Sequence, residues 1–126
     1  MLKGLLASGI TMGVAAVFPQ ALVFPFYVGI LGLVAGVYPG LAMVDDEEGH
    51  PAAEWVAAVV ILTVGLVGLW GSPLLLSGAF LAHGFWSLLH PLTALGKGTP
   101  EAYPRFCVSY DLVATCFIVY MWSVGA

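Results

Sequence analysis

Long apolar stretches dominate the chain, and short groups of proline, glycine and charged residues interrupt them at intervals. An α-helix that crosses a bilayer needs about 20 predominantly apolar residues, within a range of roughly 17 to 25. Five stretches approach or reach this length, and they predict an all-α, polytopic membrane helix bundle. The bundle is expected to form one domain over residues 1–126, with transmembrane helices at about 2–18, 25–44, 52–70, 73–90 and 104–124.

Proline and glycine mark the predicted helix boundaries. Proline is tolerated in the first turn of a helix, where its missing N–H would have no partner. Pro25 and Pro73 are therefore predicted to begin the second and fourth helices. Pro19-Gln20 separates the first two helices. If the chain instead stays helical through this point, the two segments merge and the bundle has four spans.

The three basic residues, Lys3, Lys97 and Arg105, favour five spans over four. With five spans all three lie on one side of the membrane, whereas four spans would separate Lys3 from the other two. Lysine and arginine are enriched in cytoplasmic loops. The sequence therefore predicts a multi-pass protein of the cell membrane, inner or plasma, with a cytoplasmic amino terminus and an extracytoplasmic carboxyl terminus.

The composition agrees with a membrane location. Hydrophobic residues make up 61% of the chain and charged residues 8%, and the mean hydropathy is +1.04. Soluble domains carry about 25% charged residues, so membrane lipids are the expected partners over most of the surface. The net charge of -4 is concentrated in the acidic loop Asp45–Glu48. No basic patch is present, which argues against a nucleic-acid partner.

Glycines at helical spacing predict close helix contacts. Gly32, Gly36 and Gly40 form two overlapping G-x-x-x-G steps in the second helix. Small residues let helix backbones approach each other in lipid. Packing within one bundle is the main interpretation of this ridge, and a homo-oligomer that meets at the same glycines is the alternative.

The candidate site lies in the last two predicted helices. At about 100° per residue, the side chains of the fourth helix at 83, 86, 87 and 90 fall within one arc. These are His83, Trp86, Ser87 and His90, and the fifth helix adds Cys107 and Asp111. Trp86, Trp122 and the tyrosines are interpreted as packing or interfacial residues rather than as residues that stack on a ligand.

Depth along the helices predicts partners for these groups. His83 and Asp111 each lie roughly 10 Å inward from the same end of two consecutive antiparallel helices. Glu54 opens the third helix near the level of His90. An ionisable group near the membrane centre costs at least about 2.5 kcal/mol, so it normally finds a partner inside the bundle. We therefore expect His83 and Asp111 to face each other in a polar site on the cytoplasmic side.

Several chemistries fit these residues. Histidine, thiolate and carboxylate all bind metals, which makes His83, His90, Cys107 and Asp111 candidate ligands. The two histidines are about 10.5 Å apart along the helix axis, so one ion would need a single histidine with Asp111, Cys107 or Glu54. His83 and Asp111 are also candidates for a catalytic acid–base pair. The sequence gives no support for haem, flavin or retinal.

The site resembles that of a family of small, uncharacterised bacterial integral membrane proteins. The family signature is H-x-x-W-D-x-x-H-H in the penultimate span, followed by C-x-x-x-D at the start of the last one. His83, Trp86, His90, Cys107 and Asp111 match it in spacing. Ser87 and Pro91 replace the aspartate and the second of the paired histidines. The resemblance covers about residues 52–120 and implies five spans with one polar site.

Three hypotheses for the function remain open. The leading one is a membrane module that binds a metal ion or small ligand, or that handles protons or ions, through His83, Trp86, Ser87, His90, Asp111 and Glu54. The second is a small membrane enzyme that acts on a lipid or isoprenoid, with His83 and Asp111 as acid and base. The third is a structural bundle or a subunit of a larger membrane complex.

Overall fold

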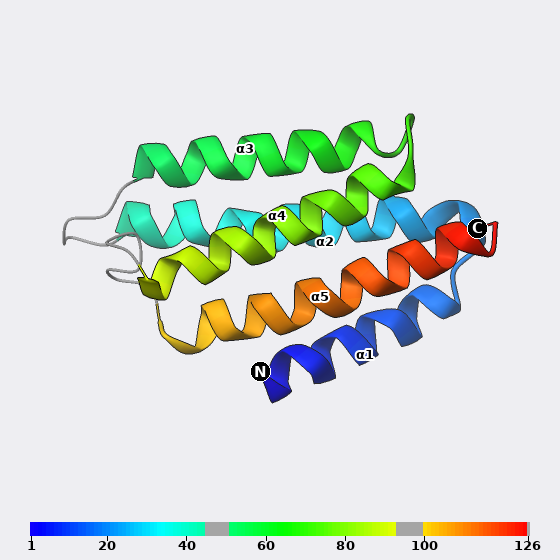
Figure 1. Ribbon diagram of the computed structural model, residues 1–126, viewed down its shortest axis with the longest axis horizontal. Helices are drawn as coiled ribbons and strands as arrows, with labels where there is room; N and C mark the ends of the chain where they lie inside the picture. The colour runs from blue at the N-terminus through cyan, green and yellow to red at the C-terminus, as the bar shows by residue number, and fades with distance from the viewer. Residues whose placement is uncertain (45–50, 93–99, 126) are drawn as a thin grey trace.

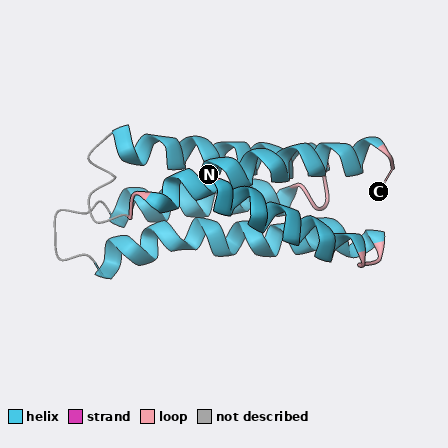
Figure 2. Ribbon diagram, turned by 90° about the horizontal axis from the view of Figure 1, so that it is seen from below, coloured by secondary structure: helices cyan, strands magenta, loops and turns pink. Residues whose placement is uncertain are grey.

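The computed structural model describes residues 1–44, 51–92 and 100–125, and every regular element in these ranges is a helix. The five α-helices of the described residues run alternately in opposite directions along one long axis, with α2 behind α4 (Figure 1). A turn of 3-10 helix, η1, extends α4. Short loops join α1 to α2 and α3 to α4 at the same end of the bundle (Figure 2). The helices are α1 (Leu2–Ala16), α2 (Gln20–Val44), α3 (Pro51–Val67), α4 (Pro73–Leu89), η1 (His90–Leu92) and α5 (Ala102–Ser123).

The prediction of five separate helices is confirmed, and the merger of the first two is wrong. The chain leaves the helix after Ala16 and re-enters it at Gln20. One boundary also differs from the prediction, because α2 begins before Pro25, which therefore lies inside the helix together with Pro39. A proline inside a helix leaves a carbonyl unbonded, but this is tolerated in apolar bundles where neighbouring groups satisfy the backbone. Pro73 does begin α4, and the Ser72 hydroxyl caps this helix.

Two of the helices, α2 and α5, are long and apolar enough to cross a membrane by length and composition. They have 25 and 22 residues, whereas α1, α3 and α4 have 15 to 17. At 1.5 Å per residue, a helix of 17 residues is about 25 Å long, somewhat short of a hydrocarbon core of about 30 Å. The predicted crossing by all five helices is thus supported by length for α2 and α5.

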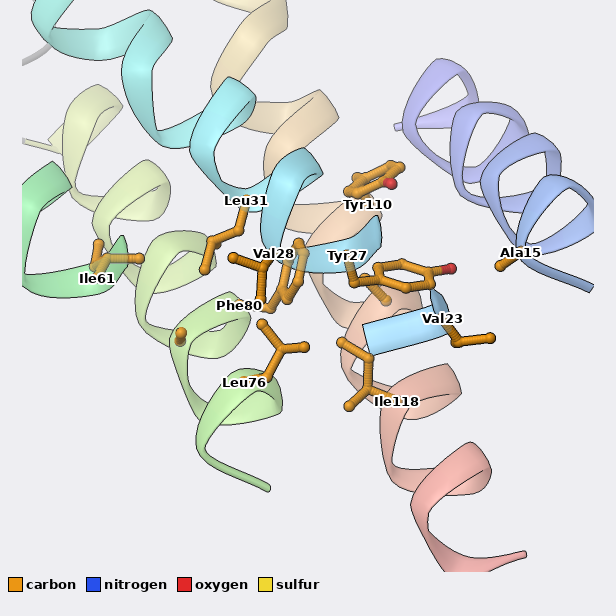
Figure 3. Close-up of a cluster of buried hydrophobic side chains, with 12 residues drawn as sticks. Ala15, Val23, Tyr27, Val28, Leu31, Ile61, Leu76, Phe80, Tyr110 and Ile118 are labelled. Carbon is orange, nitrogen blue, oxygen red and sulfur yellow. The ribbon is translucent and has the colours of Figure 1, made fainter. Parts of the chain in front are cut away.

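An apolar core fills the half of the bundle near the α1–α2 and α3–α4 turns. Tyr27 lies at its centre, with its ring against Phe80 of α4 and Phe117 of α5. Leu31, Leu76 and other labelled side chains surround this contact in Figure 3. The buried histidine of α4 and the buried aspartate of α5, His83 and Asp111, lie in the opposite half.

Large apolar side chains also cover the outside of the bundle. Leu6, Leu33, Val59, Phe85 and Val119 are examples, one from each helix, and all are exposed. In a protein surrounded by water, exposed apolar patches of this extent normally mark a surface that another apolar phase covers.

Two of the three glycines of the α2 ridge do not pack inside the bundle. A methyl group on Gly36 or Gly40 would meet no atom of the described residues within 4 Å, and one on Gly32 would make only an ordinary contact with Leu62. The interpretation of this ridge as internal packing is therefore wrong at Gly36 and Gly40, which face outward. The close approach lies instead at Gly4 of α1, where a Cβ would overlap Ser109 and Phe106 of α5.

Candidate functional site

His83 and Asp111 form a buried pair between α4 and α5, as predicted. The Nδ1 atom of His83 lies 2.8 Å from Oδ2 of Asp111, and both side chains are 1% exposed. At this distance the two atoms share one hydrogen, which is carried either by the ring nitrogen or by the carboxyl group. The equal depth that the sequence predicted for the two residues is thus sufficient to bring them together.

His90 forms a second buried pair, with Glu54 at the start of α3. Its Nε2 atom lies 2.7 Å from Oε1 of Glu54. The other carboxyl oxygen of Glu54 accepts a hydrogen bond from Nε1 of Trp86 at 2.9 Å. Glu54 lies in the first turn of its helix, where the helix dipole favours a negative charge.

The end of α4 explains how the His90 ring is held. Pro91 follows His90, and the last turn tightens so that the His90 backbone N–H bonds to the Ser87 carbonyl instead of continuing the α pattern. This leaves the Trp86 carbonyl for the His90 side chain, whose Nδ1 atom lies 2.9 Å away. Pro91 therefore helps to orient the neighbouring histidine.

These contacts fix one hydrogen of the His90 ring and restrict the position of a second. A carbonyl oxygen can only accept, so Nδ1, which faces the Trp86 carbonyl, must carry a hydrogen. The short contact between Nε2 and Glu54 then needs one further proton. That proton sits either on Nε2, giving an imidazolium and a carboxylate, or on Glu54, giving two neutral groups. The His90–Glu54 pair therefore holds one shared proton between two buried groups.

Tyr38 of α2 connects the two pairs. Its ring stacks on His90 with centroids 3.9 Å apart, and its centroid is 5.7 Å from that of His83. On its other side Tyr38 makes an edge contact with Tyr103, whose hydroxyl donates to the Val34 carbonyl at 2.8 Å. The sequence interpretation treated the tyrosines as packing or interfacial residues and missed this role. A buried tyrosine hydroxyl normally finds a hydrogen-bond partner. The presence of Tyr38 within an apolar helix was therefore the sequence feature that could have indicated its role.

Four buried polar atoms around the pairs have no hydrogen-bond partner within the described part of the chain. They are the Tyr38 hydroxyl, Nε2 of His83, the Ser87 hydroxyl and Oδ1 of Asp111. The Tyr38 hydroxyl lies beside the side chains of Ser87 and Cys107 without completing a hydrogen bond to either. An unsatisfied buried polar group costs about 1–3 kcal/mol. All four atoms lie close to the two histidine–carboxylate pairs, between α2, α4 and α5.

Gly84 sets the separation of α4 and α5 beside the first pair. A Cβ at this position would lie 3.3 Å from Cβ and 3.4 Å from Oδ2 of Asp111. Such contacts are tighter than ordinary van der Waals packing, so glycine here allows the carboxyl group to lie against α4. Gly84 was not among the residues predicted from the sequence to belong to the site.

The candidate metal ligands are divided between separate partners. His83 is bound to Asp111, while His90 is bound to Glu54. Cys107 is buried beside Tyr38 and Tyr103. Among the described residues no three of histidine, cysteine, aspartate and glutamate gather closely enough to hold an ion. The arrangement therefore does not bring His83, His90, Cys107 and Asp111 together as one ligand set.

Comparisons with known proteins identify no relative of this chain. No family model, no curated protein and no solved structure matches the chain. The contacts described above are therefore the basis for assigning a function.

Proposed function

We propose that this chain is a five-span membrane protein that reversibly binds protons at a buried cluster of two histidine–carboxylate pairs. The amino terminus lies in the cytoplasm, the carboxyl terminus lies outside, and the cluster is on the cytoplasmic side. His83 with Asp111 and His90 with Glu54 are the two proton-binding pairs. Tyr38, Trp86 and Ser87 hold and connect them.

The surface of the bundle supports the membrane location. Exposed apolar side chains occur on all five helices, and α2 and α5 have the length needed for a crossing. Tryptophan is enriched at both membrane–water interfaces. Trp55 lies near the start of α3 and Trp70 just after its end, and both are exposed. At 1.5 Å per residue α3 rises about 18 Å from Trp55 to its end at Val67, and Trp70 lies in the turn beyond, so the two tryptophans lie towards the two opposite interfaces of a thin bilayer.

The shared proton of His90 and Glu54 is the observation that carries the proposal. It follows from two distances, 2.9 Å from Nδ1 to the Trp86 carbonyl and 2.7 Å from Nε2 to the Glu54 carboxyl. Histidine is the side chain that ordinarily changes its charge between about pH 5 and 8. Ionisable groups inside a membrane are expensive and commonly belong to proton pathways. A pair that only fixed the helix register could be built from neutral amides.

The arrangement of the two pairs also supports exchange of protons rather than permanent storage of one. Both pairs contact the Tyr38 ring, so a charge on one histidine acts on the other through a short path of low polarity. His83 keeps a second ring nitrogen, Nε2, without a partner among the described residues. This nitrogen is the position at which the cluster can accept an additional proton.

The proposal is tested by counting the protons that the purified protein exchanges with the medium. The protein in liposomes is titrated between about pH 4 and 9, the range in which carboxyl and histidine groups normally change charge. Glu54→Gln and Asp111→Asn should each remove one exchangeable proton relative to wild type. Glu101→Gln is the matched control for the first variant, because Glu101 is exposed at the same end of the bundle.

The titration separates proton binding from a purely structural cluster. If neither Glu54→Gln nor Asp111→Asn lowers the number of protons exchanged over this pH range, the pairs do not exchange protons. The third hypothesis, a structural bundle or a subunit of a larger complex, would then be favoured.

A further inference from the structure

A continuous groove on the outer surface between α4 and α5 ends at basic residues. Its apolar part has a volume of about 230 Å³ and is lined by Leu81, Phe85, Leu112 and others, with Asp111 at its base. A smaller hollow of about 100 Å³ continues it, since Leu88 and Val108 line both. This second hollow reaches Arg105 and is also lined by Ser87.

The end of the groove carries positive charge. Arg105 also lines a third hollow, of about 550 Å³, whose wall includes Lys3. Lys3 and Arg105 are the lysine and arginine residues of the described part of the chain. Arg105 contacts Glu101 at 3.6 Å, but both side chains are largely exposed, so Arg105 remains accessible to a second anion.

The groove joins an apolar channel to a positively charged end. Its middle part is lined by apolar side chains and by Ser87, whose Oγ atom is buried beside the Tyr38 hydroxyl. The groove therefore offers, in order, an apolar channel and two cations. A hydrocarbon chain followed by a phosphate matches this order of chemical groups.

We propose that this groove binds one anionic phospholipid, with an acyl chain between α4 and α5 and its phosphate at Arg105 and Lys3. The acyl chain passes over Asp111, where Gly84 has no side chain to fill the groove, and it keeps water away from the His83–Asp111 pair. This inference rests on the membrane location in the proposed function and not on proton binding.

The test is native mass spectrometry of the whole protein released from detergent that contains equal amounts of phosphatidylglycerol and phosphatidylcholine with the same acyl chains. Wild type should retain one phosphatidylglycerol in preference to phosphatidylcholine. Val108→Trp fills the groove and should abolish retention. Val119→Trp is the matched control, because Val119 is an exposed apolar residue of the same helix and lies outside the groove.

Arg105→Gln tests the headgroup separately and leaves the packed residues unchanged. It should lower the preference for phosphatidylglycerol about fivefold, the factor expected for one cation near an anionic phosphate. This variant still decides the proposal if Val108→Trp does not fold. Equal retention of the two lipids by wild type, unchanged retention in Val108→Trp, or a lipid-free dimer would overturn the phospholipid site. These measurements involve no proton exchange, so their failure is distinct from failure of the proposed function.

Discussion

The rings of Tyr38 and His90 are stacked, with an interplanar angle of 21° and centroids 3.9 Å apart. Tyr38 also lies against His83, so one side chain of α2 contacts His83 of α4 and His90 of η1. The two histidine–carboxylate pairs are therefore parts of one cluster that involves four helices. Electrostatic interactions are stronger in such an interior than in water, which means that the protonation of one pair affects the other.

His83 and Asp111 should be coupled energetically. His83→Ala and Asp111→Ala are each expected to lower the free energy of unfolding in detergent by about 1–3 kcal/mol, because each leaves a buried partner unsatisfied. The double variant should lose less than the sum of the two. The coupling in membrane proteins averages about 0.6 kcal/mol, so a small but measurable deviation is expected. Strictly additive losses would contradict the pairing.

Gly84 should be more sensitive to substitution than Gly78 on the same helix. Gly84→Ala presses a methyl group against Asp111 and is expected to destabilise the protein, whereas Gly78 has no neighbouring atom within 4 Å. Because alanine is the better helix former by roughly 0.5–1 kcal/mol, Gly78→Ala should be neutral or stabilising. Thermal unfolding of the two variants in detergent makes the comparison. The same response from both would mean that the approach of α4 to Asp111 does not need glycine.

Gly4 and Gly36 should respond to leucine in opposite ways. Gly4→Leu forces α1 away from Ser109 of α5 and should lower the unfolding temperature strongly, while Gly36→Leu places a side chain outside the bundle and should leave it nearly unchanged. The oligomeric state of Gly36→Leu, measured by size exclusion with light scattering, serves as a second readout. A shift to monomer in that variant would support the homo-oligomer through Gly32, Gly36 and Gly40. Strong destabilisation of monomeric Gly36→Leu would contradict the outward position of this glycine.

The two termini should lie on opposite sides of the membrane. Five alternating helices place the start of α1 and the end of α5 towards opposite ends of the bundle (Figure 1). Lys3 and Arg105 line one hollow and so share an end, which the positive-inside tendency assigns to the cytoplasm. A carboxyl-terminal alkaline phosphatase fusion, active only outside the cytoplasm, should therefore be active and the corresponding fluorescent-protein fusion dark. The reverse pattern would contradict the topology.

Helical geometry was enough to predict the contact between His83 and Asp111, and it placed Glu54 near the level of His90. Both follow from rise per residue on antiparallel helices. Tyr38 could not be placed in the same way, because it comes from a helix that is not a sequence neighbour of α4, and its contact depends on the lateral packing of α2. The outward position of Gly36 was missed for the same reason, since a G-x-x-x-G ridge does not identify the helix that it faces.

The shared proton of His90 and Glu54 is the central claim, and infrared difference spectroscopy during a pH titration tests it most directly. Wild-type protein in liposomes should show a reversible change in carboxyl or carboxylate absorption, and part of it should disappear in Glu54→Gln and another part in Asp111→Asn. Glu101→Gln should remove only the signal of an exposed carboxyl group. A wild-type spectrum whose buried carboxyl bands do not change with pH, or one that neither buried substitution alters, would contradict proton binding by these pairs.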